Sequence, residues 1–265
     1  MKKFWFILTA LVTTCFLVAC SGSQGVSPKT IKEKKKIVVA TESEFAPFEF
    51  KSLVNSKDTL VGADIELAKA IGEKLGVKVE FSVMSFDNVL ASVQSGKADI
   101  AIAGISVTDE RKKVYDFSDS YYTSENVVIV KKDKVNDYTS TDSLAKQTVG
   151  TQKGSVQETV AKKQISKASV VSLTSNGEMI NELKSGQLQA VVLEKAIAEG
   201  YIAQNDDLTL ASFNLKSDGS DAYAVATRKG SDDLLKEINA VIKETKDSGK
   251  FDQWLKEASN YKQSK

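Results

Sequence analysis

The sequence contains no histidine, and its two cysteines, Cys15 and Cys20, both lie within the first 20 residues. Without histidine there can be no catalytic imidazole and no histidine-ligated metal. The position of the cysteines excludes a thiolate metal cluster, a disulfide framework and cysteine-based catalysis in the rest of the chain. We therefore expect no cofactor, no metal site and no catalytic residue.

The sequence also lacks an excess of charge of one sign, since the formal net charge of its 265 residues is +1. A polyanion partner such as nucleic acid is therefore not expected. Hydrophobic residues make up 42% of the chain and charged residues 27%, which argues against disorder. The length is sufficient for one large or two smaller globular domains.

The only long apolar run is at the start, where Lys2 and Lys3 precede residues 4–19. This run is too short and wrongly flanked for a membrane span, so residues 1–19 are predicted to be a signal peptide. Residues 17–20 (LVAC) resemble a bacterial lipobox, which implies a lipidated Cys20, with residues 20–35 as anchor and linker. The protein would then be extracytoplasmic and anchored to the cell membrane. A secreted protein with a chance cysteine is the alternative.

The mature chain begins with a pattern typical of α/β proteins. Residues 37–41 form a short apolar run that predicts a strand, and Pro47 excludes a helix in the loop that follows. Apolar residues within 64–75 share one helical face that ends at Gly76, and apolar residues then alternate over 77–83. A strand, a helix and a second strand in this order predict a parallel sheet with a right-handed crossover.

An internal similarity suggests two lobes. A predicted helix over 86–94 leads through a glycine turn to a strand over 99–103, and 176–184 leads in the same way to 189–193. Two similar α/β lobes explain this pattern, although helix, glycine and strand also follow one another by coincidence.

Two strand-like runs would connect these lobes. We expect residues 126–130 to cross to the second lobe and residues 222–227 to cross back, which gives a two-strand hinge. The first lobe would then contain residues 36–128 and 223–265, and the second lobe residues 129–222.

Polar groups gather where the strand over 99–103 ends. Gly104 permits a turn, Ser106 and Thr108 provide hydroxyls, and Thr108 is a suitable N-cap for a helix that carries Arg111. Backbone N–H groups at a helix start attract an anion, and a guanidinium binds a carboxylate through two parallel hydrogen bonds. The segment therefore has the features of a carboxylate receptor, or else it is a capped surface helix with a solvated arginine.

Several motifs together resemble the polar amino-acid-binding proteins of ABC importers, over nearly the whole mature chain. They are residues 106–111 (SVTDER), 115–118 (YDFS), 121–122 (YY), 46–49 (APFE), 62–68 (GADIELA) and 249–254 (GKFDQW). The resemblance implies a two-lobed periplasmic-binding-protein-like fold of type II with the ligand cleft between the lobes. It also implies a receptor that closes on a free L-amino acid and presents it to an ABC transporter permease, without chemistry.

The same resemblance implies roles for individual residues. Arg111 and the amides of Ser106 and Ser155 would hold the α-carboxylate of the ligand. The Gly104 carbonyl, the Ser106 hydroxyl and Glu194 would hold its α-ammonium. The family usually has aspartate where this chain has Glu194, and an exposed acid at a helix start is the alternative for that residue.

The ligand side chain would lie between Phe45 and Phe86, although by pattern alone either ring belongs more often to a core. In relatives that bind cationic amino acids, an acid at the position of Glu42 faces the distal end of the ligand. A planar guanidinium could stack between the rings and donate to Glu42, so arginine is the expected ligand. The alternative is that Glu42 and Glu44 are solvated acids near a neutral ligand such as glutamine.

Two other functions remain open from the sequence. Some proteins of this architecture are periplasmic enzymes such as dehydratases, and Glu42 or Glu194 could then act as general acid. A site that holds both charged ends of a zwitterion argues against an enzyme. The second possibility is a sensor or adhesin whose partner is another protein.

Overall fold

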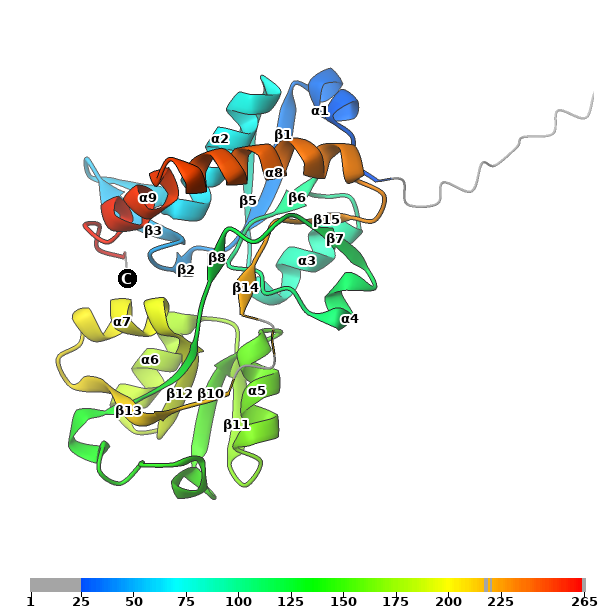
Figure 1. The fold of residues 1–265 in the computed structure, drawn as a ribbon. Coiled ribbons are helices and arrows are strands. Elements are labelled where there is room, and N and C mark those ends of the chain that lie inside the picture. Colours follow the sequence, from blue (N-terminus) through cyan, green and yellow to red (C-terminus); the bar gives the residue numbers. More distant parts are fainter. Residues whose placement is uncertain (1–24, 217–218, 220, 264–265) are drawn as a thin grey trace, which may run out of the picture.

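The computed structural model describes residues 25–216, 219 and 221–263. Figure 1 shows two lobes, one above the other, joined by strands that pass between them. Each lobe is built on a five-stranded mixed sheet with helices on its faces, which confirms the predicted α/β class. Within the described part of the chain, no helix is long and apolar enough to cross a membrane.

The first lobe contains the sheet with strand order β5-β1-β6-β15-β7. β1 pairs in parallel with both β5 and β6, whereas β15 is antiparallel to β6 and β7. The strands are β1 (Lys36–Thr41), β5 (Lys78–Val83), β6 (Ile100–Ala101), β7 (Tyr115–Phe117) and β15 (Ala226–Arg228). The strand expected over 99–103 is only two residues long, although Ile102 still donates to the Ala40 carbonyl. The chain then turns at Gly104, which has φ of 53° and whose amide bonds to Asp64.

The helices of the first lobe follow the apolar pattern of the sequence. α2 ends where Gly76 adopts φ of 70°, as predicted, and α8 buries Leu235, Ile238 and Ile242 on one face. The helices are α1 (Pro28–Lys34), α2 (Ala63–Leu75), α3 (Phe86–Gln94), α4 (Asp109–Lys112), α8 (Asp232–Asp247) and α9 (Lys250–Ala258).

A small antiparallel sheet that was not predicted lies beside the first lobe. Its strands are β2 (Glu44–Phe45), β3 (Glu49–Val54) and β4 (Lys57–Val61), in the order β2-β3-β4. The turn between β3 and β4 uses Asn55 and Ser56 with positive φ angles of 50° and 61°. The segment expected as a plain loop after β1 is therefore held in place by backbone pairing.

The second lobe repeats the arrangement of the first. Its sheet order β11-β10-β12-β9-β13 also places the first parallel strand between the second and the third, followed by antiparallel strands. Its elements are β9 (Asn126–Lys131), η1 (Lys132–Lys134), η2 (Thr141–Leu144), β10 (Thr148–Gln152), α5 (Val156–Gln164), β11 (Ser169–Leu173), α6 (Asn176–Ser185), β12 (Ala190–Glu194), α7 (Lys195–Ala203) and β13 (Leu208–Asn214). The units α3–β6 and α6–β12 hold equivalent places, so the predicted similarity of the lobes is confirmed.

The crossing between the lobes lies earlier than expected. β8 (Tyr122–Thr123) and β14 (Ala222–Tyr223) form a two-stranded antiparallel ladder in Figure 1. The expectation that residues 126–130 cross is wrong, because β9 pairs with β12 and β13 inside the second sheet. Its apolar run reflects burial at the centre of that sheet. The lobe boundaries stay predictions, and the one after residue 128 falls within β9.

Candidate functional site

The carboxyl ends of parallel strands from both lobes point into the space where the lobes meet. Glu42 follows β1, and Gln152 is the last residue of β10. The Gln152 carboxamide donates to both oxygens of the Glu42 carboxylate, at 3.0 and 3.2 Å. The two lobes are therefore in direct contact at the sheet edges where α/β proteins bind ligands. We call this region the cleft.

Glu42 lies at the centre of the cleft, with only 4% of its surface exposed. Burial raises its pKa to about 8, the bond from Gln152 acts in the opposite direction, and the charges of Glu44 and Glu194 raise it further. An ionised carboxylate in such a place needs a cation beside it. Glu42 can therefore hold either a proton or the positive end of a ligand.

Arg111 provides the cation of the cleft. Thr108 caps its helix as predicted, since the Thr108 hydroxyl accepts from the Arg111 amide at 3.1 Å. The guanidinium donates to the Ser106 carbonyl at 2.7 Å and, across the cleft, to the Gly154 carbonyl at 3.1 Å. Burial lowers the pKa of Arg111 to about 10, whereas the charge of Glu194 raises it. The residue is half-buried and stays charged at neutral pH, and its guanidinium is held by one carbonyl from each lobe, in contrast to the freely solvated arginine that the sequence allowed.

Gly104 and Ser106 line the first-lobe side of the cleft. A Cβ at Gly104 would lie 2.5 Å from Cε1 of Phe45, so a larger residue would displace that ring. The Gly104 amide donates to Asp64 at 3.0 Å. Ser106 is buried and forms an antiparallel bridge with Tyr223 on β14. Both residues thus lie on the same side of the cleft as Arg111, whose guanidinium donates to the Ser106 carbonyl.

On the second-lobe side, Ser155 begins α5. Its hydroxyl accepts from the Glu158 amide at 3.2 Å, but the Glu158 carboxylate accepts from the Gly154 amide and not from that of Ser155. The Ser155–Glu158 pair thus forms only one half of a capping box. The Ser155 amide, expected to bind a carboxylate, donates to the Gln152 carbonyl at 3.2 Å. Other N–H groups in the first turn of α5 have no preceding helical turn to bond to.

Glu194 ends β12 and precedes α7, with 5% of its surface exposed. The alternative of an exposed acid at a helix start is thereby excluded. Burial raises the pKa of Glu194 to about 7, and the neighbouring Tyr223, Gln157 and Arg111 act in the opposite direction. Glu194 and Arg111 thus supply opposite charges from opposite lobes, which suits a zwitterion.

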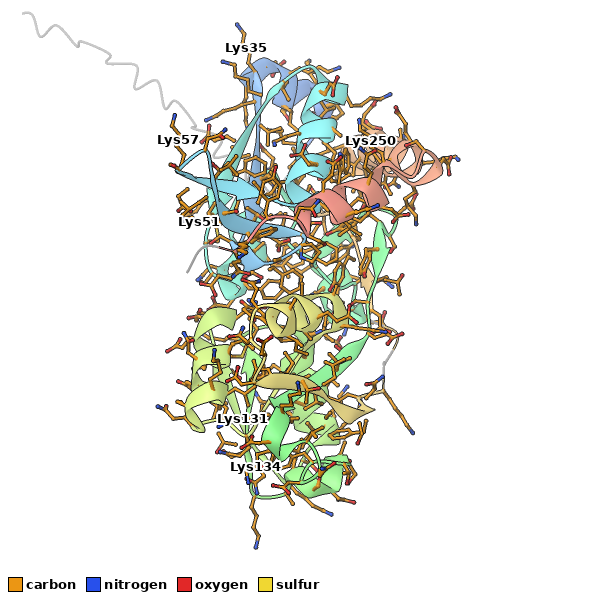
Figure 2. The ribbon with its side chains drawn as sticks, turned by 90° about the vertical axis from the view of Figure 1, so that its left-hand side faces the viewer. Lys35, Lys51, Lys57, Lys131, Lys134 and Lys250 are labelled. Atoms are coloured by element: carbon orange, nitrogen blue, oxygen red, sulfur yellow. The ribbon has the colours of Figure 1, made fainter. Side chains whose placement is uncertain are left out.

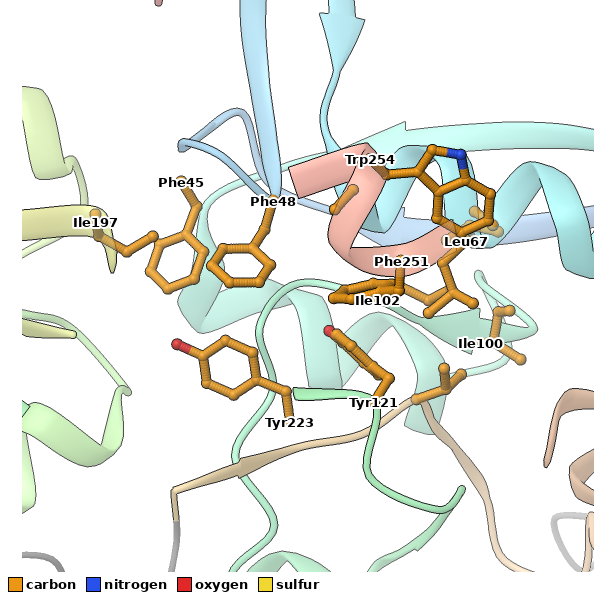
Figure 3. Packing of buried hydrophobic residues seen from close by; sticks show 14 of the residues in the cluster. Phe45, Phe48, Leu67, Ile100, Ile102, Tyr121, Ile197, Tyr223, Phe251 and Trp254 are labelled. Atoms are coloured by element: carbon orange, nitrogen blue, oxygen red, sulfur yellow. The ribbon is translucent and has the colours of Figure 1, made fainter. Parts of the chain in front are cut away.

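The two expected aromatic residues have different surroundings. The centre of the Arg111 guanidinium lies 5.8 Å from the centroid of the Phe86 ring, within the range of a cation–π contact. Phe45 packs among Phe48 and Tyr223, with ring centroids 5.9 and 6.3 Å away, and Figure 3 shows Ile197 of the second lobe on its other side. Both rings are buried, in keeping with the core alternative. The structure brings all eight predicted binding residues to this cleft or its walls, whereas Cys20 lies outside the described residues.

Sequence reasoning missed Gln152, Tyr223 and the partners of Glu44. Gln152 was overlooked because no motif near the end of β10 marks it as a binding residue. Tyr223 was hidden in a run interpreted only as a crossing strand, yet it is fully buried beside the cleft. Glu44 does not lie free in a loop, because its carboxylate contacts the start of α6.

Many lysine side chains lie on the outside of the molecule. Figure 2 shows Lys35 and Lys57 toward the outer end of the first lobe and Lys131 and Lys134 at the outer end of the second. Among the described residues, no group of three or more carboxylate, cysteine or histidine side chains could hold a metal ion.

Comparison with known proteins gives consistent results. Residues 37–258 match the family model described as bacterial extracellular solute-binding proteins, family 3. The chain is 34% identical to the arginine-binding extracellular protein ArtP of Bacillus subtilis, over 97% of each sequence. It is 31% identical to the glutamine-binding protein GlnH of the same organism, over 97% of this chain and 98% of GlnH.

A similar solved structure is the amino acid ABC transporter substrate-binding protein AbpA of Streptococcus pneumoniae, bound to L-arginine. The two chains share 50% identity with a TM-score of 0.86, over 89% of this chain and all of AbpA. The described fold and its cleft thus have a counterpart that holds an amino acid.

Proposed function

Because this chain belongs to the bacterial extracellular solute-binding proteins of family 3, we propose that it binds free L-arginine in its cleft and delivers it to an ABC transporter permease. Another cationic amino acid would fit by the same chemistry. The two lobes close on the ligand, and a ligand that contacts both of them shifts the population toward the closed state. The protein acts as a receptor and performs no reaction.

One observation carries the choice of a cationic ligand, and it is the burial of Glu42. Its carboxylate reaches a carboxamide of the second lobe and is surrounded by two further acids, Glu44 and Glu194. A guanidinium placed there would neutralise Glu42 and donate two hydrogen bonds to it. A neutral ligand would leave the acid protonated or uncompensated, which costs binding free energy.

The remaining roles follow from the two ends of the zwitterion. The α-carboxylate would bind Arg111 together with amides of the Ser106 segment and of the first turn of α5 at Ser155. The α-ammonium would bind the Gly104 carbonyl, the Ser106 hydroxyl and Glu194. Arg111 now donates to two carbonyl oxygens, and a carboxylate is a stronger acceptor for the same fork.

The ligand side chain would pass the rings of Phe45 and Phe86 on its way to Glu42.

Arginine and citrulline provide the test, because they have the same shape and differ in the charge of the distal group. Calorimetry should give at least about tenfold tighter binding of arginine, since a buried charge pair contributes more than about 1.4 kcal/mol. Glu42→Gln should narrow this ratio, and Glu110→Gln on the exposed face of α4 serves as control. Equal or tighter binding of citrulline or glutamine by the wild type would overturn the cationic ligand and leave the receptor function standing.

We also propose that the mature protein is a lipoprotein attached through Cys20, because residues 17–20 resemble a lipobox. Two acyl chains would keep the receptor near its permease. Cys20→Ala should release the protein into the medium or leave it unprocessed. Cys15→Ala should have no effect, because the signal peptide is removed. Membrane fractionation in which both variants stay mature and attached would contradict the anchor.

For the lobes we propose the predicted division, residues 36–128 and 223–265 against 129–222, with the first boundary moved to before β9 so that this strand stays in the second lobe with β12 and β13. The paired segments β8 and β14 would carry the hinge.

A further inference from the structure

Glu44 makes the most specific contact between the lobes outside the predicted site. It lies on β2 in the first lobe, and its Oε2 accepts a hydrogen bond from the Ser175 hydroxyl at 2.6 Å and from the Gly177 amide at 3.0 Å. Both donors are at the beginning of α6 in the second lobe. A carboxylate of one lobe thus caps a helix of the other.

The contact is favourable for two physical reasons. The first amides of a helix have no partner in the preceding turn, and the Gly177 amide is one of them. The N-terminus of a ten-residue helix also carries partial positive charge, which a carboxylate stabilises.

The helix does not need Glu44 in order to fold. Ser175 is its own N-cap, since the Ser175 hydroxyl accepts from the Glu178 amide at 3.1 Å. The bond to Glu44 therefore adds nothing required within the second lobe. What it does is connect α6 to the first lobe, at a sequence separation of more than 130 residues.

A second bond holds the same segment. The hydroxyl of Tyr201 on α7 donates to the backbone carbonyl of Glu44 at 3.2 Å, and the Gln263 carboxamide donates to that hydroxyl at 3.3 Å. Side chain and backbone of Glu44 are thus both bound by the second lobe. These contacts need the lobes to be together, since their partners come from different sheets.

Glu42, two residues before Glu44, has a different environment. Its partner is the Gln152 side chain in the cleft, whereas Glu44 bonds to a helix start and a tyrosine outside it. We propose that Glu44 is an interlobe latch, a positioning residue that stabilises the closed state for every ligand without contacting any of them. The inference rests on the proposed function in one respect, namely that a ligand is held by closure.

The test compares the affinities of arginine and citrulline in matched variants. Glu44→Gln should weaken both by the same factor, about fivefold, because a charge-assisted bond of the closed state becomes a neutral one. The ratio of the two affinities should not change. The loss of affinity should appear as a faster dissociation rate, measured by stopped flow. Glu178→Gln, on the exposed side of the same helix turn, should leave both affinities at the wild-type value.

A second variant reverses the sign of the contact. Ser175→Asp keeps a good N-cap for α6 but places a second carboxylate against Glu44. We expect a loss of affinity of at least about tenfold for both ligands, with an unchanged melting temperature of the free protein. The double variant Glu44→Gln/Ser175→Asp should recover most of that loss, since an amide can donate to the new carboxylate.

Three results would overturn the latch: a changed arginine-to-citrulline ratio in Glu44→Gln, unchanged affinities in that variant, or no recovery in the double variant. A lower melting temperature of free Glu44→Gln would also count against it, because it would show a structural role within one lobe. An error in the proposed ligand would give a different result, because the wild-type protein would then bind a neutral amino acid more tightly than arginine. The effect of Glu44→Gln on affinity would in that case be measured with the neutral amino acid.

Discussion

The two lobes use the same strand order but present different chemistry to the cleft. The first lobe provides charged and aromatic side chains, Glu42, Arg111 and Phe86, at the ends of its strands. The second provides Glu194 at the end of β12, the start of α5 with Ser155 as its N-cap, and Gln152 as the side chain that reaches across. A repeated scaffold thus does not fix what its strand ends do, since the residues that follow each strand decide that.

This difference has an energetic consequence. The buried charges of the first lobe lose water when the second lobe covers them, which is why the pKa of Glu42 rises and that of Arg111 falls. Glu194 of the second lobe carries the same kind of cost, since burial raises its pKa to about 7, whereas backbone donors at helix starts cost less to desolvate. The groups that most need a partner of opposite charge in the closed state are therefore Glu42 and Arg111 of the first lobe and Glu194 of the second.

The largest effect is expected from removing the cation of the first lobe, Arg111. Arg111→Ala should lower the affinity for every amino acid by roughly 30-fold to 1,000-fold, because a bidentate ion pair that closure buries contributes about 2–4 kcal/mol. Calorimetry measures the loss, and Lys112→Ala on the exposed side of α4 is the control. Binding within about threefold of wild type would show that the carboxylate lies elsewhere.

A change of pH tests the role of the buried acids in closure without any mutation. Glu42 and Glu194 have raised pKa values in the closed ligand-free state, about 8 and about 7, so closing takes up protons. The closed state is then favoured at pH 5, and this advantage is lost as the pH rises from about 4.5 through about 8. For Glu42 alone the effect at pH 7 is about 3 kcal/mol.

Small-angle scattering of the free protein checks this effect. The radius of gyration should be smaller at pH 5 than at pH 8, and Glu42→Gln should reduce the difference. Saturating arginine should give the smaller radius at both pH values. An identical radius for the free wild type across this range would contradict the link between these acids and closure.

The smallest effect is expected at the rim, where both lobes contribute a side chain. Lys153 lies 2.9 Å from Asp87, with 55% and 17% of the two side chains exposed. Asp87→Asn should weaken ligand binding by about twofold to threefold at low salt and by nothing measurable at high salt, as for exposed ion pairs generally. Titrations at two ionic strengths would measure this, and an effect larger than that of Arg111→Ala would invalidate the ranking.

Much of this arrangement could be predicted from the sequence, because its signals are local. Gly104, Thr108 and Arg111 lie within eight residues, and a strand end followed by an N-cap has a recognisable pattern. The similarity of the helix–strand units likewise predicted two related lobes. The short β3–β4 hairpin was missed because Phe50 and Leu53 do not alternate regularly, so no apolar stripe marks the strand.

The contacts between the lobes could not be predicted in this way. Gln152 meets Glu42 at a separation of 110 residues, and Gly177 meets Glu44 at 133 residues. Nothing in the sequence near either partner marks such a pair, because their meeting depends on the relative placement of two separately folded sheets. The same dependence explains why burial of Glu194 was left open.

The ladder of β8 and β14 has a mechanical consequence. Tyr223 on β14 packs on Phe45, Phe48 and Tyr121 and is bridged to Ser106, so this end of the connection is built into the first lobe (Figure 3). If β8 and β14 carry the hinge, as proposed, the pivot belongs to the same packed unit as Phe45 and Ser106 of the first lobe. Closure would then move the second lobe about an axis that keeps a fixed position relative to these two residues.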